Sequence, residues 1–193
     1  MENARTDGMQ VVLRAAAFAS HKHREQRRKD RKSTPYINHP IALALVLREV
    51  GRVRDSSVIA AALLHDTIED TVTTYNELRG EFGLEIANYV REVTDAKFVG
   101  KDARKRLQVS KAGHSSKAAR LIKLADKICN LRDILATPPV GWSVERGHAY
   151  FDWCKDVVDG IRGTNARLEK KFDQLYMQRS KIGAVRKKKR SLS

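Results

Sequence analysis

The 193-residue sequence contains only two cysteines, Cys129 and Cys154, which stand far apart and in no ligand-like spacing. Neither a disulfide framework nor a thiolate zinc site is therefore indicated. The sequence also lacks an apolar run of about 18 residues and a charged-then-apolar leader, so we expect neither a membrane span nor a secretory signal. These absences together predict a cytoplasmic protein.

Acidic residues are scarce relative to basic ones. The chain has 23 Asp and Glu against 38 Lys and Arg, which gives a formal net charge of +15. The run RKKKR at residues 186–190 supplies only part of this excess. A basic protein favours anionic partners, which include nucleic acid, an acidic protein and a phosphorylated small molecule. Charge alone does not choose among them.

Strict alternation of polar and apolar residues, the pattern of a half-buried strand, is absent. Apolar residues instead recur at helical spacing along most of the chain, which predicts an all-α protein with one core. The basic stretch 97–108 receives no helix assignment. We expect helices over residues 8–22, 40–50, 56–70, 75–82, 84–93, 115–135, 144–161 and 165–176.

Apolar periodicity ends near Ile182, and the remaining residues are mostly small or basic. Such a composition cannot bury enough apolar surface to order itself. We therefore expect one domain over residues 1–182 and a basic, disordered tail over residues 183–193.

The segment AALLHDTIEDT at residues 61–71 begins as a buried helix and ends in one histidine and three carboxylates. On a continuous helix, His65 lies one turn before Glu69, and Asp66 lies one turn before Asp70. Carboxylates held this close repel one another unless a cation neutralises them. A metal ion is the economical explanation, and the alternative is a solvated helix end with exposed acids.

Two further segments supply residues of the same chemistry. His39, in TPYINHP, stands just before Pro40 at a helix entrance, and Asp126, in LADKICNL, interrupts an apolar helical stripe. With His65 and Asp66 they form a set of two histidines and two carboxylates. Such a set suits Mn, Fe or Zn better than Mg, because imidazole favours softer metals. Taken singly, His39 could be a capping histidine and Asp126 a surface charge.

The order H…HD…D is the signature of HD-domain metal phosphohydrolases. The longer strings RRKD, TPYINHP, ALLHDTIEDT, EVTDAK, KRLQ and KLADKICNLRDI resemble the hydrolase half of RelA/SpoT proteins, and small alarmone hydrolases in particular. The resemblance implies that residues 1–182 form an HD-domain helical bundle. It further implies an enzyme of the stringent response that hydrolyses the alarmones ppGpp and pppGpp to GDP or GTP and pyrophosphate. The usual ion of the family is Mn²⁺, with Zn²⁺ or Fe²⁺ as further candidates.

The family's residue roles carry over onto the matching positions of this sequence. The positions that match metal ligands are His39, His65, Asp66 and Asp126. The acidic pair near the attacking water matches Glu69 and Asp70. The positions that match nucleotide contacts are Arg28, Lys29, Asn130 and Tyr150. Three more cations could hold diphosphate oxygens or be solvated surface charges, namely Lys101, Arg104 and Arg106.

Two other functions stay open. In the first, the same active site removes the 2′-phosphate of NADPH. In the second, the protein has no catalytic activity and either senses alarmone or binds nucleic acid through its basic tail. The intact Glu69 and Asp70 favour an enzyme. We expect no membrane or nucleic-acid partner, and leave open whether the chain forms a homo-oligomer.

Overall fold

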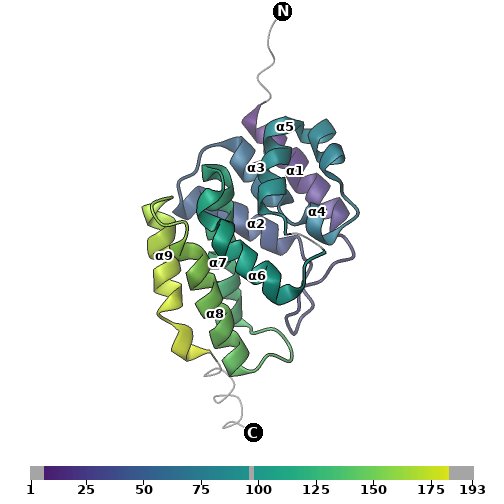
Figure 1. The fold of residues 1–193 in the computed structure, drawn as a ribbon. Coiled ribbons are helices and arrows are strands. Elements are labelled where there is room, and N and C mark those ends of the chain that lie inside the picture. Colours follow the sequence, from purple (N-terminus) through teal and green to yellow (C-terminus); the bar gives the residue numbers. More distant parts are fainter. Residues whose placement is uncertain (1–6, 96–97, 183–193) are drawn as a thin grey trace, which may run out of the picture.

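The computed structural model describes residues 7–95 and 98–182, and in this part of the chain the regular elements are helices, apart from one isolated bridge between Arg27 and Pro35 (Figure 1). The prediction of an all-α protein is thereby confirmed. None of the described helices is long and apolar enough to cross a membrane. The α-helices are α1 (Gly8–Lys22), α2 (Asn38–Leu45), α3 (Ser56–Leu64), α4 (Thr67–Asp70), α5 (Tyr75–Val93), α6 (Lys101–Lys111), α7 (Lys117–Ala136), α8 (Val144–Asp159) and α9 (Ala166–Tyr176).

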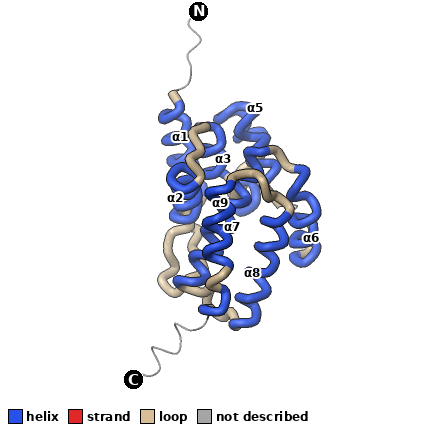
Figure 2. The backbone as a smooth tube through the Cα atoms, turned by 90° about the vertical axis from the view of Figure 1, so that its left-hand side faces the viewer, coloured by secondary structure: helices blue, strands red, loops and turns tan. Residues whose placement is uncertain are grey.

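Helices α3 and α7 form the centre of the molecule. Helix α3 packs against α1, α2, α5 and α7, and α7 packs in addition against α8 and α9. Figure 1 shows α1, α3 and α5 together near the N-terminal end, with α8 and α9 toward the other end, and Figure 2 shows the same bundle from the side. Leu63 and Leu64 of α3 and Leu124 of α7 are buried. Each such leucine contributes roughly 1.5–3 kcal/mol of apolar burial.

Side-chain caps begin several helices where the sequence predicts a start. Asp7 accepts a hydrogen bond from the Met9 amide before α1, and Asp55 accepts one from the Ser57 amide before α3. Ser143 caps α8 in the same way. These short polar side chains satisfy amide groups that have no partner within the helix. Helices α1, α3 and α8 start at the expected residues 8, 56 and 144.

The expected helix 56–70 is wrong as a single element, because α3 ends at Leu64 and the backbone departs from regular helical dihedral angles at Asp66. Asp66 has φ −99° and ψ −1°, and α4 starts only after it. The hydroxyl of Thr67 donates to the Leu64 carbonyl at 2.6 Å, which supplies a partner for a carbonyl at the end of α3. The break lets two residues that are adjacent in the sequence face the same site.

Two further elements, α2 and α5, differ in detail from the expectation. Helix α2 starts before residue 40, and its continuation over Val46–Val50 is a π-helical turn. The predicted pair 75–82 and 84–93 is one assigned helix, α5, but Gly83 inside it has a φ of +83°, so the expected separation at this glycine is present.

Helix α6 lies in the basic stretch that received no helix assignment. None of its residues is fully buried, so its sequence carries little apolar periodicity. The Lys105 carbonyl accepts a hydrogen bond from the Trp153 indole of α8 at 3.2 Å, and this tertiary contact helps to hold the helix. The predicted tail, residues 183–193, lies outside the described residues.

Candidate metal and phosphate site

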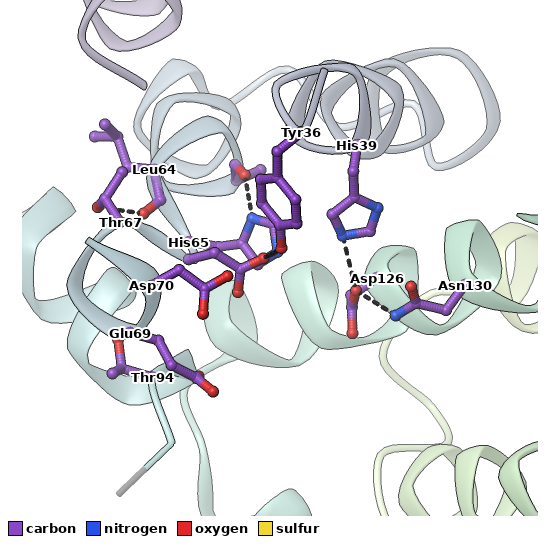
Figure 3. Close-up of polar contacts among 12 residues, drawn as sticks. Tyr36, His39, Leu64, His65, Thr67, Glu69, Asp70, Thr94, Asp126 and Asn130 are labelled. Carbon is purple, nitrogen blue, oxygen red and sulfur yellow. Dashed lines mark hydrogen bonds and ion pairs between the residues drawn. The ribbon is translucent and has the colours of Figure 1, made fainter. Parts of the chain in front are cut away.

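Three side chains from different helices converge on one point. The ligand atoms of His39, His65 and Asp126 all lie within 4.8 Å of one another, and Nε2 of His39 is 3.2 Å from Oδ1 of Asp126. Figure 3 shows them extending from α2, from the end of α3 and from α7. Both histidines are buried, and Asp126 is half-buried. The structure therefore brings together three of the four predicted metal ligands.

Asp66, the fourth predicted ligand, lies against this group. Its Oδ2 is 2.8 Å from Nε2 of His65 and also accepts a hydrogen bond from the Tyr36 hydroxyl. Burial, followed by the Asp66 carboxylate, raises the pKa of Tyr36 well above its ordinary value. The hydroxyl therefore stays protonated and remains a hydrogen-bond donor to Asp66.

The hydrogen bonding of His65 shows that this group of side chains suits a cation. Nδ1 of His65 lies 2.9 Å from the Ala62 carbonyl, so a neutral ring must carry its proton on Nδ1. Nε2 is then a bare acceptor that faces the Asp66 carboxylate, and two acceptors this close need a positive charge between or beside them. A second ring proton on Nε2 supplies such a charge: burial alone would lower the pKa of His65, but the Asp66 carboxylate raises it to about 9. A metal ion would take the place of that proton.

The nature of the donors narrows the choice of cation. Two imidazole nitrogens and carboxylate oxygens are the ligands of Zn²⁺, Mn²⁺ and Fe²⁺ sites in proteins. Asp126 offers its carboxylate in the charged form, because Lys127 and His39 keep its pKa below the usual range although burial opposes this. The residues present therefore fit a divalent transition metal.

Glu69 and Asp70 stand beside this group on the short helix α4, where Figure 3 shows both carboxylates. Oδ2 of Asp70 accepts a hydrogen bond from the side-chain amide Nε2 of Gln26 at 2.8 Å. Oε2 of Glu69 accepts one from the Asp95 backbone amide at 3.1 Å, and burial raises the pKa of Glu69. A carboxylate with a raised pKa exchanges protons with water more readily near neutral pH.

A buried lysine, Lys127, contacts the metal-binding group through Asp126. Nζ of Lys127 contacts Oδ2 of Asp126 at 3.1 Å and Oε1 of Gln108 at 3.2 Å, and lies 4.2 Å from the centroid of the Trp153 ring. Gln108 in turn donates to Asp95 at 2.6 Å. These contacts link a predicted metal ligand to the residue whose amide holds Glu69.

Two adjoining cavities open on the site. The larger, of about 580 Å³, has Arg28, Lys29, Asn130 and Tyr150 in its wall. The smaller, of about 210 Å³, is lined by the predicted metal ligands and Glu69, and shares three of those four residues with the larger cavity, Lys29 being the exception. Asn130 donates to Oδ1 of Asp126 at 2.7 Å. The four nucleotide contacts matched in the sequence therefore surround the cavity next to the metal-binding group.

The three cations of the basic stretch are placed differently. Lys101 and Arg106 are exposed on α6 and line neither cavity. Arg104 contacts Glu69 at 3.4 Å, so it neutralises a carboxylate of the site. The structure does not bring Lys101 and Arg106 to the predicted binding site.

Sequence reasoning missed several residues that contact the site. Tyr36 and Lys127 both lie inside quoted motifs, three residues before His39 and next to Asp126, so position relative to a ligand could have drawn attention to them. Asp95 lies inside the quoted string EVTDAK, but its contact with Glu69 joins distant segments. Gln26 stands outside the quoted strings, and its contact with Asp70 likewise joins distant segments.

Comparisons of sequence and of structure with known proteins agree with one another. The HD domain family matches residues 15–146. Proteins named guanosine-3′,5′-bis(diphosphate) 3′-pyrophosphohydrolase MESH1 are similar over most of their length. The one from Xenopus tropicalis is 52% identical over 167 residues, 86% of this chain and 93% of its own. The one from Homo sapiens is 52% identical over 168 residues, 87% of this chain and 94% of its own.

A solved structure gives the same result. It belongs to a protein described as a metazoan ortholog of SpoT that hydrolyses ppGpp and plays a role in starvation responses. This chain superposes on it with a TM-score of 0.85 at 47% sequence identity, covering 88% of this chain and 95% of the other.

Proposed function

The chain belongs to the HD-domain family, and we propose that it is a metal-dependent hydrolase that releases pyrophosphate from the 3′ position of guanosine 3′,5′-bis(diphosphate) and its 5′-triphosphate analogue. The observation that carries the proposal is the convergence of His39, His65 and Asp126 beside Glu69 and Asp70. The similarity to enzymes of this name, over most of both chains, supports the choice of substrate.

His39, His65, Asp66 and Asp126 hold the metal ion. We propose Mn²⁺ as the ion, with Zn²⁺ or Fe²⁺ as the other ions that this donor set accepts. A bound divalent ion lowers the pKa of water and polarises a phosphoryl oxygen. Tyr36 keeps Asp66 oriented through its hydroxyl, and Lys127 does the same for Asp126.

Glu69 and Asp70 orient the attacking water and accept its proton. The water oxygen bonds to the phosphorus that carries the ribose 3′ oxygen, and the bond between that phosphorus and the 3′ oxygen breaks. The 3′ oxygen takes up a proton, so the products are a nucleotide with a free 3′ hydroxyl and pyrophosphate. The hydrogen bonds from Gln26 and from the Asp95 amide hold the two carboxylates in place for this step.

The nucleoside occupies the larger cavity. Arg28 is anchored there by an ion pair with Asp133 at 2.7 Å, which keeps its guanidinium at the junction of the two cavities. Lys29 and Asn130 supply further donors to phosphate and ribose oxygens. Tyr150 offers an aromatic surface in the same wall.

The compartment that we propose is the cytoplasm. Cys129 and Cys154 are both buried and unpaired in the structure, as suits a protein that works where thiols stay reduced.

The function is tested by incubating the purified protein with Mn²⁺ and, separately, with ppGpp, pppGpp and NADPH. We expect pyrophosphate release from the first two. Phosphate release from NADPH without pyrophosphate release from ppGpp would support the alternative enzyme. Binding without any turnover in the presence of Mn²⁺, Zn²⁺ or Fe²⁺ would support the non-catalytic sensor.

A further inference from the structure

The two cavities differ in what they can hold. Pockets for whole small-molecule ligands generally span about 300–1,000 Å³. The larger cavity, at about 580 Å³, falls in this range, whereas the smaller one, at about 210 Å³, does not. The smaller cavity contains the metal-binding group and therefore has room for a phosphate or diphosphate group but not for a nucleoside.

The walls of the smaller cavity contain three cations, and two of them are already paired. Arg28 contacts Asp133 at 2.7 Å, and Lys127 contacts Asp126 at 3.1 Å. For the third, Lys123, the described part of the chain provides no hydrogen bond or ion pair. Lys123 is thus the cation of this cavity whose ammonium group is available to an incoming anion.

The position of Lys123 distinguishes it from an ordinary surface lysine. It lies one helical turn before Lys127 on α7, so both side chains extend from the same face of the helix toward the cavity. Its side chain is half-buried rather than exposed. Burial and the neighbouring Lys127 ammonium lower the pKa of Lys123. The carboxylates of Asp95, Asp126 and Glu69 oppose this lowering, but none of them forms an ion pair with Lys123. An anion placed beside the half-buried ammonium reduces the cost of its partial desolvation.

The geometry points to a role for this group in the proposed reaction. We propose that Lys123 binds the distal phosphate of the 3′-diphosphate, and thereby makes the site prefer a 3′-diphosphate to a 3′-monophosphate. The inference rests on the proposed function, since it concerns the group that is transferred. The ammonium donates hydrogen bonds to the terminal phosphate and offsets part of its charge, while the phosphorus next to the ribose reacts at the metal-binding group.

The test compares Lys123→Met with Lys117→Met, a control on the same helix at an exposed position. With ppGpp, Lys123→Met should lower kcat/KM by about tenfold or more, the usual effect of losing one hydrogen bond to a charged group. With the analogue that carries a single phosphate at the 3′ position, the two variants should have the same kcat/KM. Lys123→Arg should recover most of the activity on ppGpp.

A binding measurement gives a second readout that does not depend on turnover. Inorganic pyrophosphate, titrated calorimetrically into the Mn²⁺-loaded protein, should bind at least about tenfold more weakly to Lys123→Met than to Lys117→Met. Inorganic phosphate should bind both variants equally. Lys123→Gln repeats both comparisons and separates the loss of charge from any effect of methionine on folding, which thermal denaturation monitors.

The outcomes are distinguishable. Equal kcat/KM on ppGpp and equal pyrophosphate affinity in Lys123→Met and Lys117→Met would overturn the inference and leave the proposed function intact. A wild-type protein that releases no pyrophosphate from ppGpp would overturn the proposed function, whatever the pyrophosphate titration shows. Equal losses on the diphosphate and the monophosphate substrate would overturn the preference for the distal phosphate.

Discussion

Nε2 of His39 lies 3.2 Å from Oδ1 of Asp126, although one residue stands at the start of α2 and the other in the middle of α7. The contact exists because α2 packs directly against α7. It brings an imidazole and a carboxylate from distant parts of the sequence into one group, and predictions about the site depend on it.

Asp126→Asn should abolish metal binding and turnover while the protein stays folded. The amide keeps the shape of the side chain but loses the charge that binds a divalent ion. Elemental analysis of the purified variant measures the metal, and pyrophosphate release measures turnover. Asp102→Asn, at an exposed position of α6, is the control. Full metal occupancy in Asp126→Asn would refute the assignment of this ligand.

Replacing Glu69 with Gln and Asp70 with Asn together should leave metal binding intact and lower kcat by about 10² or more, the scale of lost general acid–base help. Alarmone binding should persist and tighten, because two negative charges facing a polyanion are removed. Calorimetry measures the binding of metal and alarmone, and pyrophosphate release measures kcat. Loss of the metal would show that Glu69 and Asp70 are metal ligands. A near-normal kcat would show that the reaction needs no acid or base from the protein.

Tyr36→Phe should weaken the affinity for the metal by about tenfold to a hundredfold, the usual effect of removing a group that orients a ligand. The variant deletes only the hydroxyl that donates to Asp66. Tyr89→Phe is the matched control, since its hydroxyl donates to the Glu85 carboxylate on the surface of α5. Competition with a chromogenic chelator measures both affinities. Equal affinities would show that Asp66 does not need this hydrogen bond, or does not bind the ion.

Gly51→Ala should destabilise the fold by about 1–3 kcal/mol, as expected for overpacking. A Cβ at residue 51 would lie 2.8 Å from the Leu47 carbonyl oxygen and 3.1 Å from the Leu168 side chain. Gly80→Ala, within α5, meets nothing within 4 Å and should stabilise by about 0.4–1 kcal/mol. Urea denaturation of both variants gives the comparison. A stable Gly51→Ala would mean that the π-helical turn Val46–Val50 and α9 can separate at little cost.

Truncation after Gly183 should change kcat/KM by no more than about threefold, or roughly 0.7 kcal/mol. The described residues that line the two cavities all lie within residues 26–153, far along the chain from the basic tail. Steady-state kinetics of the truncated protein at two salt concentrations would check this. A loss beyond about tenfold at low salt would mean that the tail contributes to substrate binding.

Much of this protein could be predicted from local sequence. Apolar spacing depends on neighbours a few positions away, and it predicts where α1, α3 and α8 start. Residue type alone made His39, His65 and Asp126 candidates for one metal site, because imidazole and carboxylate are unusual beside apolar helix faces. The resemblance of whole motifs then indicated the chemistry.

Other features were decided only by how the helices pack. The hydrogen bond from the Gln26 side chain to Asp70 and the one from the Asp95 backbone amide to Glu69 join segments that local spacing does not relate. The placement of the lysines also depends on how the helices pack. Lys123 lines the smaller cavity whereas Lys101 stays exposed on α6, and no charge pattern distinguishes two such lysines. Local sequence determines which face a helix buries, but the neighbour against which that face packs depends on the whole chain.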